Sequence, residues 1–107
     1  MYKLRWSKQA KRDAETCERA GFKAQLDEIL DTVEQSPYEP TQQFERLVGN
    51  LKGVYSRRIN YYNRLIYTTH PNEEGLRDEN GELYEGIVLV HRSWGHDYDL
   101  PKKRASK

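Results

Sequence analysis

The chain has 107 residues, a length that allows one domain with a modest core and excludes two. Charged residues make up 33% of it and hydrophobic residues 36%, so we expect a soluble protein whose apolar side chains are concentrated in a few elements. A single cysteine, Cys17, excludes an intramolecular disulfide framework, and no apolar run follows the first residues, so we expect a cytoplasmic protein without a signal peptide or membrane span.

The first third of the chain predicts one strand followed by two helices. Residues 2–6 alternate aromatic or apolar side chains with cationic ones, which is typical of a half-buried strand. Ser7 is placed to cap a helix that ends near Ala20-Gly21, because its hydroxyl can accept from the exposed N–H groups of a first turn. A second amphipathic helix runs from about Phe22 to Gln35, and Ser36-Pro37 ends it.

The middle of the chain predicts an antiparallel hairpin rich in arginine and tyrosine. The segment Tyr55–Tyr67 contains three arginines and four tyrosines. Its runs Tyr55–Tyr61 and Arg64–Thr69 favour strands, joined by a turn at Tyr62-Asn63. Side chains alternate between the faces of a strand, so Arg58 and Arg57 lie on opposite faces. We expect this hairpin to present cations to RNA.

The remaining segments complete an α+β domain. Residues 44–53 predict a short strand or turn that brings Glu45 near the sheet, and residues 70–82 predict a long acidic loop with an Asn-Gly hairpin at its tip. Residues 87–90 favour a central strand. The predicted order is β-α-α-β-β-β, with two N-terminal helices on one side of a small, mostly antiparallel sheet in a single domain of residues 1–100. Residues 101–107 form a basic tail that we expect to be flexible.

The chain offers a candidate for each group that metal-independent RNA cleavage requires. A base removes the proton of the ribose 2′-OH, cations stabilise the charge on phosphorus, and an acid protonates the departing 5′-oxygen. Glu45 is the candidate base, Arg64 with Arg58 supplies the cations, and His96 is the candidate acid. Tyr98 is placed to donate a hydrogen bond to the phosphate or the leaving group.

Several of these residues also have a simpler interpretation. Arg57 and Arg58 are candidate RNA contacts, yet exposed strand arginines also discourage pairing between sheet edges. Tyr61 is a candidate for base stacking, although a tyrosine on a sheet is more often packed. The histidines and the cysteine lack the spacing of metal ligands, so we expect neither a metal nor a cofactor.

The order of these motifs resembles the Txe/YoeB family of bacterial toxins, within the RelE-like superfamily. The resemblance extends from Tyr2 to Tyr98, and the segment Tyr55-Ser56-Arg57-Arg58-Ile59 is its most specific part. The other matching motifs are Glu45-x-Leu47, Asn50-Leu51-x-Gly53, Asn63-Arg64-Leu65-Ile66-Tyr67, and the His96 and Tyr98 that follow a hydrophobic strand.

The resemblance implies a RelE-like fold and a toxin that cleaves messenger RNA during translation in the ribosomal A site. It implies that a YefM/Axe-like antitoxin holds the toxin inactive, and it is compatible with a homodimer. The catalytic glutamate, arginine and histidine of the family fall on Glu45, Arg64 and His96. Arg58 matches an arginine expected to contact phosphate.

The chain departs from the family pattern near two of these residues. Val48 stands where the family often has a lysine, so Lys52 or Arg46 is expected to supply that phosphate-binding cation. Asp97 separates His96 from Tyr98. Two rivals therefore stay open, a catalytically degenerate toxin homologue that binds antitoxin or RNA and a general binder of single-stranded RNA. Which of Glu45 and His96 is the general base also stays open.

Overall fold

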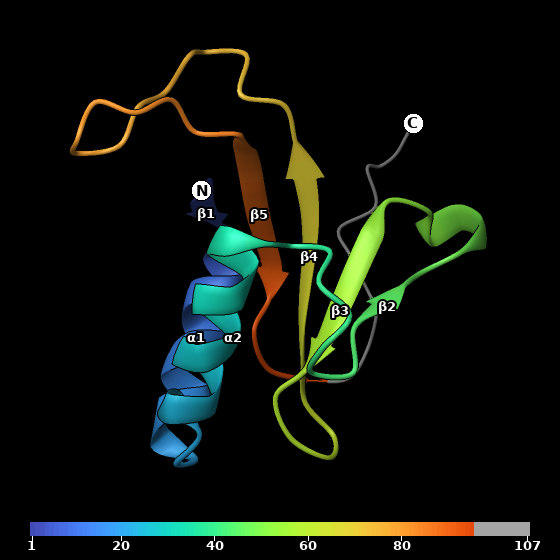
Figure 1. The fold of residues 1–107 in the computed structure, drawn as a ribbon. Coiled ribbons are helices and arrows are strands. Elements are labelled where there is room, and N and C mark those ends of the chain that lie inside the picture. The colour runs from blue at the N-terminus through green and yellow to red at the C-terminus, as the bar shows by residue number, and fades with distance from the viewer. Residues whose placement is uncertain (96–107) are drawn as a thin grey trace.

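The computed structural model describes residues 1–95, and Figure 1 shows two helices packed on one face of a five-stranded sheet. Residues 96–107 lie outside the described residues, and with them the predicted acid His96, Tyr98 and the basic tail. The elements in chain order are β1 (Tyr2–Trp6), α1 (Lys8–Arg19), α2 (Lys23–Gln35), β2 (Glu45–Arg46), the 3-10 turn η1 (Gly49–Leu51), β3 (Val54–Arg58), β4 (Arg64–His70) and β5 (Gly86–Arg92).

The strands are arranged in the order β1-β5-β4-β3-β2. The first strand pairs with the last in parallel, with Tyr2 opposite Gly86 and Trp6 opposite Val90, and every other pair is antiparallel. The predicted α+β class, with helices covering one side of a mostly antiparallel sheet, is confirmed. The predicted central strand, β5, is an interior strand between β1 and β4, and β2 is the short strand expected near Glu45.

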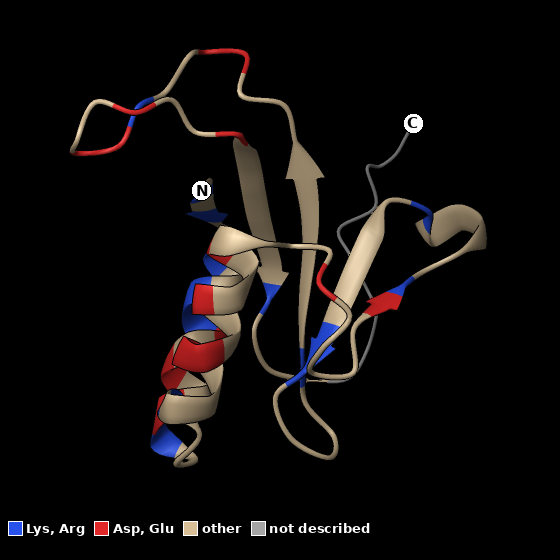
Figure 2. Cartoon of the chain, viewed as in Figure 1, with Lys and Arg blue, Asp and Glu red and all other residues tan. Residues whose placement is uncertain are grey.

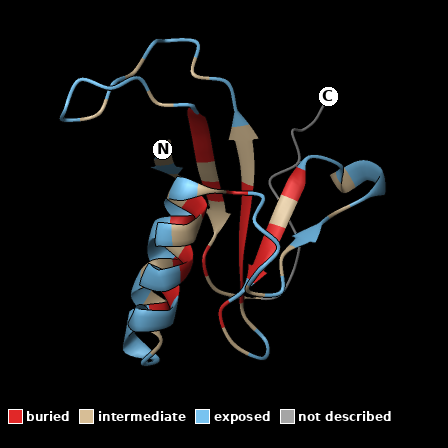
Figure 3. Cartoon of the chain, in the orientation of Figure 1, coloured by how far each residue is buried: buried red, intermediate tan, exposed pale blue. Residues whose placement is uncertain are grey.

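The hydrophobic core lies between the helices and the sheet, and Figure 3 shows the buried side of the helix layer facing the strands. The Ser7 hydroxyl caps α1 by accepting from the Ala10 N–H at 3.0 Å, and it donates to the His91 carbonyl at 3.0 Å. This cap therefore also fastens the helix to the end of β5. The buried core residues are Ala10, Cys17, Leu26, Ile29, Val33, Ile59, Leu65, Tyr67, Val88 and Val90.

The predicted first strand of the hairpin is wrong at its end, because β3 stops at Arg58 and not at Tyr61. The Asn60 side chain accepts from the backbone N–H groups of Tyr62 at 3.1 Å and Asn63 at 2.9 Å. A side-chain oxygen that satisfies these donors replaces the strand ladder with a turn. Residues 59–63 consequently form a loop that carries Tyr61 and Tyr62 into solvent.

The long loop between β4 and β5 extends beyond the end of the sheet (Figure 1). Its tip is the expected small hairpin, with an isolated bridge between Arg77 and Leu83 and a hydrogen bond of 2.9 Å from the Gly81 N–H to the Asp78 carbonyl. Within residues 1–95, neither helix is long or apolar enough to cross a membrane.

Candidate active site

Arg64 is the centre of the candidate site, at the first position of β4 and opposite Arg58 of β3. Its side chain is only 9% exposed. The guanidinium donates from Nε to the Ser56 hydroxyl and from Nη2 to the Gln43 carbonyl at 2.7 Å. These two contacts fix the plane of the guanidinium, so Arg64 presents a positioned charge rather than a flexible one.

Glu45 lies beside that guanidinium. It pairs with Ser56 across β2 and β3, and its Oε1 is 3.6 Å from Arg64 Nη2. Its side chain is 53% exposed, so solvent and substrate reach a carboxylate whose inner neighbour is buried. The structure thus brings together two of the predicted catalytic residues, on strands that are not adjacent in the sheet.

The backbone that precedes Glu45 has an unusual conformation. Gln42 and Gln43 both have φ of +56°, in the left-handed region, which costs a residue other than glycine of the order of 1 kcal/mol or more. The Gln42 carbonyl accepts from the Arg58 N–H at 2.9 Å, and the Gln43 carbonyl accepts from Arg64. Both strained residues therefore aim a carbonyl at the candidate site. The sequence contains no signal for this turn, because glutamine does not favour the left-handed region.

The last described residue also reaches Arg64. Gly95 accepts from the Arg64 N–H through its carbonyl at 2.8 Å, and its own N–H donates to Asn63 Oδ1 at 2.8 Å. Gly95 has φ of +102°, a conformation that favours glycine. Gly95, the residue before His96 in the sequence, is therefore held beside Arg64.

The predicted role of Arg57 as an RNA contact is corrected, because this side chain is fully buried on the helix side of the sheet. Its guanidinium donates to three backbone carbonyls and to the Tyr67 hydroxyl, and it lies 4.7 Å from the centre of the Phe44 ring. The carbonyls belong to Pro37, Glu39 and Thr41. These contacts make Arg57 the support of the connector that leads to Glu45.

Arg58 points out of the sheet at the end of β3 and is exposed. Figure 2 shows basic residues gathered where β3 ends and β4 begins, next to the loop that carries Tyr61. Tyr61 is 78% exposed, and its ring meets that of Tyr62 edge to face at 4.8 Å between centroids. An exposed cation thus lies opposite Arg64 in the sheet, and the loop between β3 and β4 carries an exposed aromatic ring.

The structure does not bring Lys52 to this cluster. Lys52 follows η1 in the turn before β3, whose five residues run from Val54 to Arg58, so that Arg58 lies about 13 Å along the strand from its first residue. The other expected substitute, Arg46, lies 5.3 Å from the ring centre of Tyr38 and 5.6 Å from that of Tyr55.

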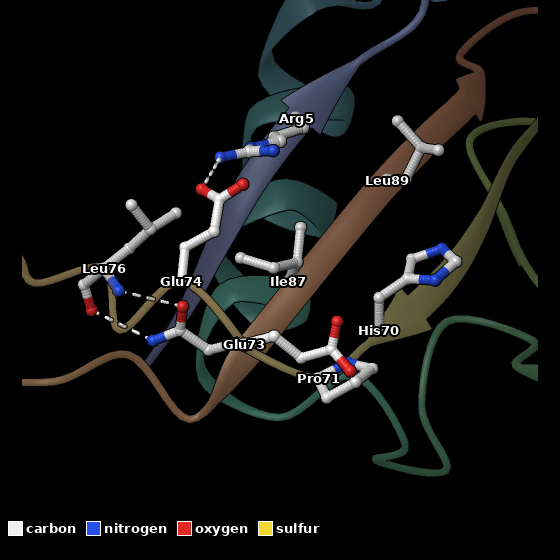
Figure 4. A pocket seen from close by; sticks show the side chains of 9 residues that line it. Arg5, His70, Pro71, Glu73, Glu74, Leu76, Ile87 and Leu89 are labelled. Carbon is white, nitrogen blue, oxygen red and sulfur yellow. Dashed lines mark hydrogen bonds and ion pairs between the residues drawn. The ribbon is translucent and has the colours of Figure 1, made fainter.

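A separate cavity of about 270 Å³ lies at the other end of the sheet. Figure 4 shows its apolar floor of Ile87 and Leu89 and the ion pair of 3.3 Å between Arg5 and Glu74 at its rim. His70, six residues along β4 from Arg64, is part of its wall. None of the predicted site residues lines it. Across residues 1–95, no cluster of three or more histidine, cysteine or carboxylate side chains has the arrangement of a metal site.

The fold has counterparts among solved structures. A YoeB/ParE toxin from Agrobacterium tumefaciens is 22% identical with a TM-score of 0.70, and the alignment covers 89% of this chain and 99% of that chain. A heterotetrameric YoeB-YefM toxin-antitoxin complex from Staphylococcus aureus is 26% identical with a TM-score of 0.62, covering 92% of this chain and 99% of that chain. A YoeB dimer from Staphylococcus aureus is 24% identical with a TM-score of 0.63, covering 91% and 98%.

Two further comparisons concern the sequence. A search of the curated proteins finds no match. The family model described as the YoeB-like toxin of bacterial type II toxin-antitoxin systems matches residues 6–76. That match covers more than half of the chain and includes Glu45, Arg58 and Arg64. The protein belongs to the family of YoeB-like toxins of bacterial type II toxin-antitoxin systems.

Proposed function

We propose that this toxin is a ribosome-dependent endoribonuclease that cuts messenger RNA without a metal ion and so inhibits translation. The observation that carries the proposal is the arrangement of Arg64, whose guanidinium is held by Ser56 and Gln43 while Nη2 lies 3.6 Å from the Glu45 carboxylate. A buried, oriented cation beside an accessible carboxylate is the arrangement that phosphodiester cleavage by an internal hydroxyl needs.

The reaction balances as a transesterification. Glu45 takes the proton of the 2′-OH, the 2′-oxygen bonds to phosphorus, and the bond from phosphorus to the 5′-oxygen breaks. His96 gives a proton to that 5′-oxygen, which leaves a 2′,3′-cyclic phosphate on the upstream fragment. Arg64 stabilises the additional negative charge on the phosphoryl oxygens, which is greatest in the transition state.

The other residues of the proposed site bind the substrate. Arg58 contacts a neighbouring phosphate, and Tyr61 stacks on a base. Tyr98 donates to the phosphate or to the leaving group. The base and acid roles of Glu45 and His96 are interchangeable in this scheme, and the pH dependence of cleavage by variants of each separates them.

The proposed partners follow from the family. A YefM/Axe-like antitoxin inhibits the toxin, the ribosome presents the message, and the site of action is the cytoplasm. Two of the solved relatives are titled as a YoeB-YefM complex and as a YoeB dimer, which supports an antitoxin complex and a homodimer here.

The test is cleavage of a defined message in a reconstituted translation system, with the cut ends mapped. Wild type is expected to cut, and Arg64→Ala and His96→Ala are each expected to lower the cleavage rate by about 10²–10³-fold. The matched control is Arg12→Ala, which removes an exposed arginine of α1 distant from the site.

Two outcomes contradict the proposal. Wild type that leaves the message intact while it binds an antitoxin supports the degenerate homologue, for which the loss of a lysine at Val48 is the specific observation. Cleavage by Arg64→Ala at the rate of wild type and of Arg12→Ala removes the assigned role of Arg64.

A further inference from the structure

The cavity at the far end of the sheet has an apolar floor. Ile87 and Leu89 of β5 alternate with the core residues Val88 and Val90, so they lie on the face of the sheet that the helices leave open. The volume of the cavity, about 270 Å³, is just below the range of about 300–1,000 Å³ of pockets that hold drug-sized ligands. The cavity therefore suits one long side chain better than a cofactor.

The rim of the cavity has one carboxylate in excess. Arg5 pairs with Glu74 at 3.3 Å, so these two charges offset each other. Glu73 is exposed, and none of the ion pairs among residues 1–95 includes it. Figure 4 shows its carboxylate on the His70 side of the cavity, across the floor from the pair of Arg5 and Glu74. A ligand in this cavity therefore meets an unpaired negative charge beside an apolar surface.

The loop that forms one wall of the cavity is also acidic. Residues 71–85 contain six carboxylates and one arginine, and Figure 2 shows acidic residues distributed along this loop. Of the six, Glu74 pairs with Arg5 and Glu85 pairs with the amine of Met1. The remaining carboxylates outnumber the arginine, so this end of the sheet has a negative potential that attracts cations and repels the phosphates of RNA.

The side chain that matches both the floor and the rim is that of arginine. Its stem of methylene groups covers apolar surface while its guanidinium stays polar, so the stem fits the floor of Ile87 and Leu89. The planar guanidinium donates two parallel hydrogen bonds to a carboxylate, and Glu73 supplies that carboxylate. A phosphate or carboxylate ligand would be repelled by Glu73, and the arginine of the lining, Arg5, is already paired. The charges of the cavity therefore select a cation.

We propose that this cavity is a docking site for an arginine side chain of a partner protein, with the stem on Ile87 and Leu89 and the guanidinium at Glu73. The inference goes beyond the proposed function, because the cavity is separate from Arg64 and Glu45 and its occupation needs no RNA cleavage. The partner segment is basic, since the acidic loop also attracts the residues around its arginine. The occupant is a protein and not the message, because the loop repels phosphate.

Titration of the isotope-labelled protein with a short peptide, followed by NMR, tests the proposal. The probe is acetyl-Gly-Ser-Arg-Ser-Gly-amide, and its matched control carries citrulline, a neutral isostere, in place of arginine. The methyl resonances of Ile87 and Leu89 are expected to shift to saturation with the arginine peptide. The citrulline peptide is expected to bind about 3–10-fold more weakly, because it lacks the positive charge.

Glu73→Gln tests the carboxylate that the proposal assigns to the guanidinium. The residue is exposed on a loop, so the variant is expected to fold as wild type does. The change is expected to weaken binding of the arginine peptide by about 3–10-fold and to remove the difference between the two peptides. The matched control is Glu79→Gln, at an exposed carboxylate of the same loop outside the cavity, where a change of less than about 2-fold is expected.

Four outcomes overturn the proposal. Methyl resonances of Ile87 and Leu89 that ignore the arginine peptide leave the cavity without this ligand, and equal effects of Glu73→Gln and Glu79→Gln show a diffuse attraction to the loop. A response to a single-stranded RNA oligonucleotide instead of the peptide assigns the cavity to RNA. Shifts that depend on protein concentration alone assign it to a second copy of this chain. None of these measurements involves cleavage, so the docking site and the proposed ribonuclease stand or fail separately.

Discussion

Arg57 donates from Nε to the Tyr67 hydroxyl at 3.0 Å, and both side chains donate to the same acceptor, the Pro37 carbonyl. Arg57 is fully buried, yet none of the ion pairs within residues 1–95 includes it. Carbonyl dipoles, the hydroxyls of Tyr67 and Thr41 and the side-chain oxygen of Gln42 satisfy its charge. The segment that connects α2 to Glu45 therefore packs around the buried guanidinium of Arg57.

Replacing this arginine is expected to destabilise the fold. Arg57→Met removes the charged donor that the carbonyls of Pro37, Glu39 and Thr41 share, which is expected to lower the free energy of unfolding by about 2–4 kcal/mol. Urea denaturation measures the change. The matched control is Arg58→Met, at the exposed neighbouring arginine, where a change within about 0.5 kcal/mol is expected. Equal effects of the two variants contradict the assignment of Arg57 as the buried support.

Ionisation of the Tyr67 phenol makes the free energy of unfolding depend on pH in the alkaline range. Burial raises the pKa of its phenol to about 12, against a smaller opposing effect of Arg57. At neutral pH, Tyr67→Phe is expected to cost about 1–3 kcal/mol, because the Arg57 and Pro37 groups lose a partner. The Tyr67 phenol ionises near pH 10 in the unfolded chain and only near pH 12 in the folded chain. Its contribution to the free energy of unfolding is therefore full below pH 10 and is lost as the pH rises toward 12. The difference between wild type and Tyr67→Phe should shrink over that interval in denaturation curves, and a constant difference contradicts it.

Protonation of His91 makes the free energy of unfolding depend on pH in the acid range. Burial, followed by the charge of His70, lowers the pKa of His91 from 6.5, and both imidazoles contact the Thr68 hydroxyl, at 2.9 Å for His91 and 2.7 Å for His70. Because the pKa of His91 is higher in the unfolded chain than in the folded chain, protonation of His91 favours unfolding. The free energy of unfolding is therefore highest above pH 6.5 and falls as the pH decreases toward the lower pKa of the folded chain. Denaturation at about pH 7.5 and about pH 5.5 should show a smaller acid loss for His91→Gln than for wild type. His70→Gln removes the smaller cause of the shift and is expected to give an acid loss between those of wild type and His91→Gln. The proposed linkage fails if all three proteins lose equally.

Tyr61 provides a test of substrate binding. Tyr61→Ala is expected to weaken the binding of a non-cleavable single-stranded RNA by about 1–3 kcal/mol, because the exposed ring offers a face to a base. Tyr61→Phe should bind as wild type does, since stacking needs the ring and not the hydroxyl. Titration by fluorescence anisotropy measures both. Weakened binding by Tyr61→Phe shows that the hydroxyl, rather than the ring, makes the contact.

Ser56 provides a test of how Arg64 is held. Ser56→Ala removes the acceptor of the Nε–H, which frees the guanidinium to rotate and is expected to lower kcat by about tenfold or more. The substrate concentration for half-maximal rate should change less, because the charge is retained. Single-turnover cleavage on ribosomes separates the two effects. A variant with wild-type kcat shows that the Gln43 carbonyl alone orients Arg64.

Much of the fold follows from local patterns in the sequence. The alternation of residues 2–6, the Ser7 cap and the apolar face of the second helix each depend on neighbours a few positions away, and these elements are observed where they are predicted. The pairing of β1 with β5 is different in kind. It joins residues more than 80 positions apart, and no local pattern specifies it.

The charged residues of the candidate site were predicted from the sequence, but the groups that hold them in place were not. Alternation places Arg57 and Arg58 on opposite faces but does not say which face the helices cover, and that decides which arginine is buried. The left-handed backbone at Gln42 and Gln43 is imposed by tertiary hydrogen bonds. Likewise, Asp13 appears in the sequence as an ordinary helix residue, yet it is buried and accepts from Arg92 and from the Ser93 N–H, about 80 positions later.

The parallel pairing of the first strand with the last has a consequence for the synthesis of the toxin. A ribosome that makes this chain delivers residues 2–6 more than 80 residues before their neighbours at 86–90. Until then β1 has no strand beside it, and the segment 92–95 that contacts Asp13 and Arg64 does not exist. Contacts this distant in sequence are slow to form and close the fold last. A nascent toxin therefore completes neither its sheet nor the contacts of Arg64 until the ribosome has made residues 86–95.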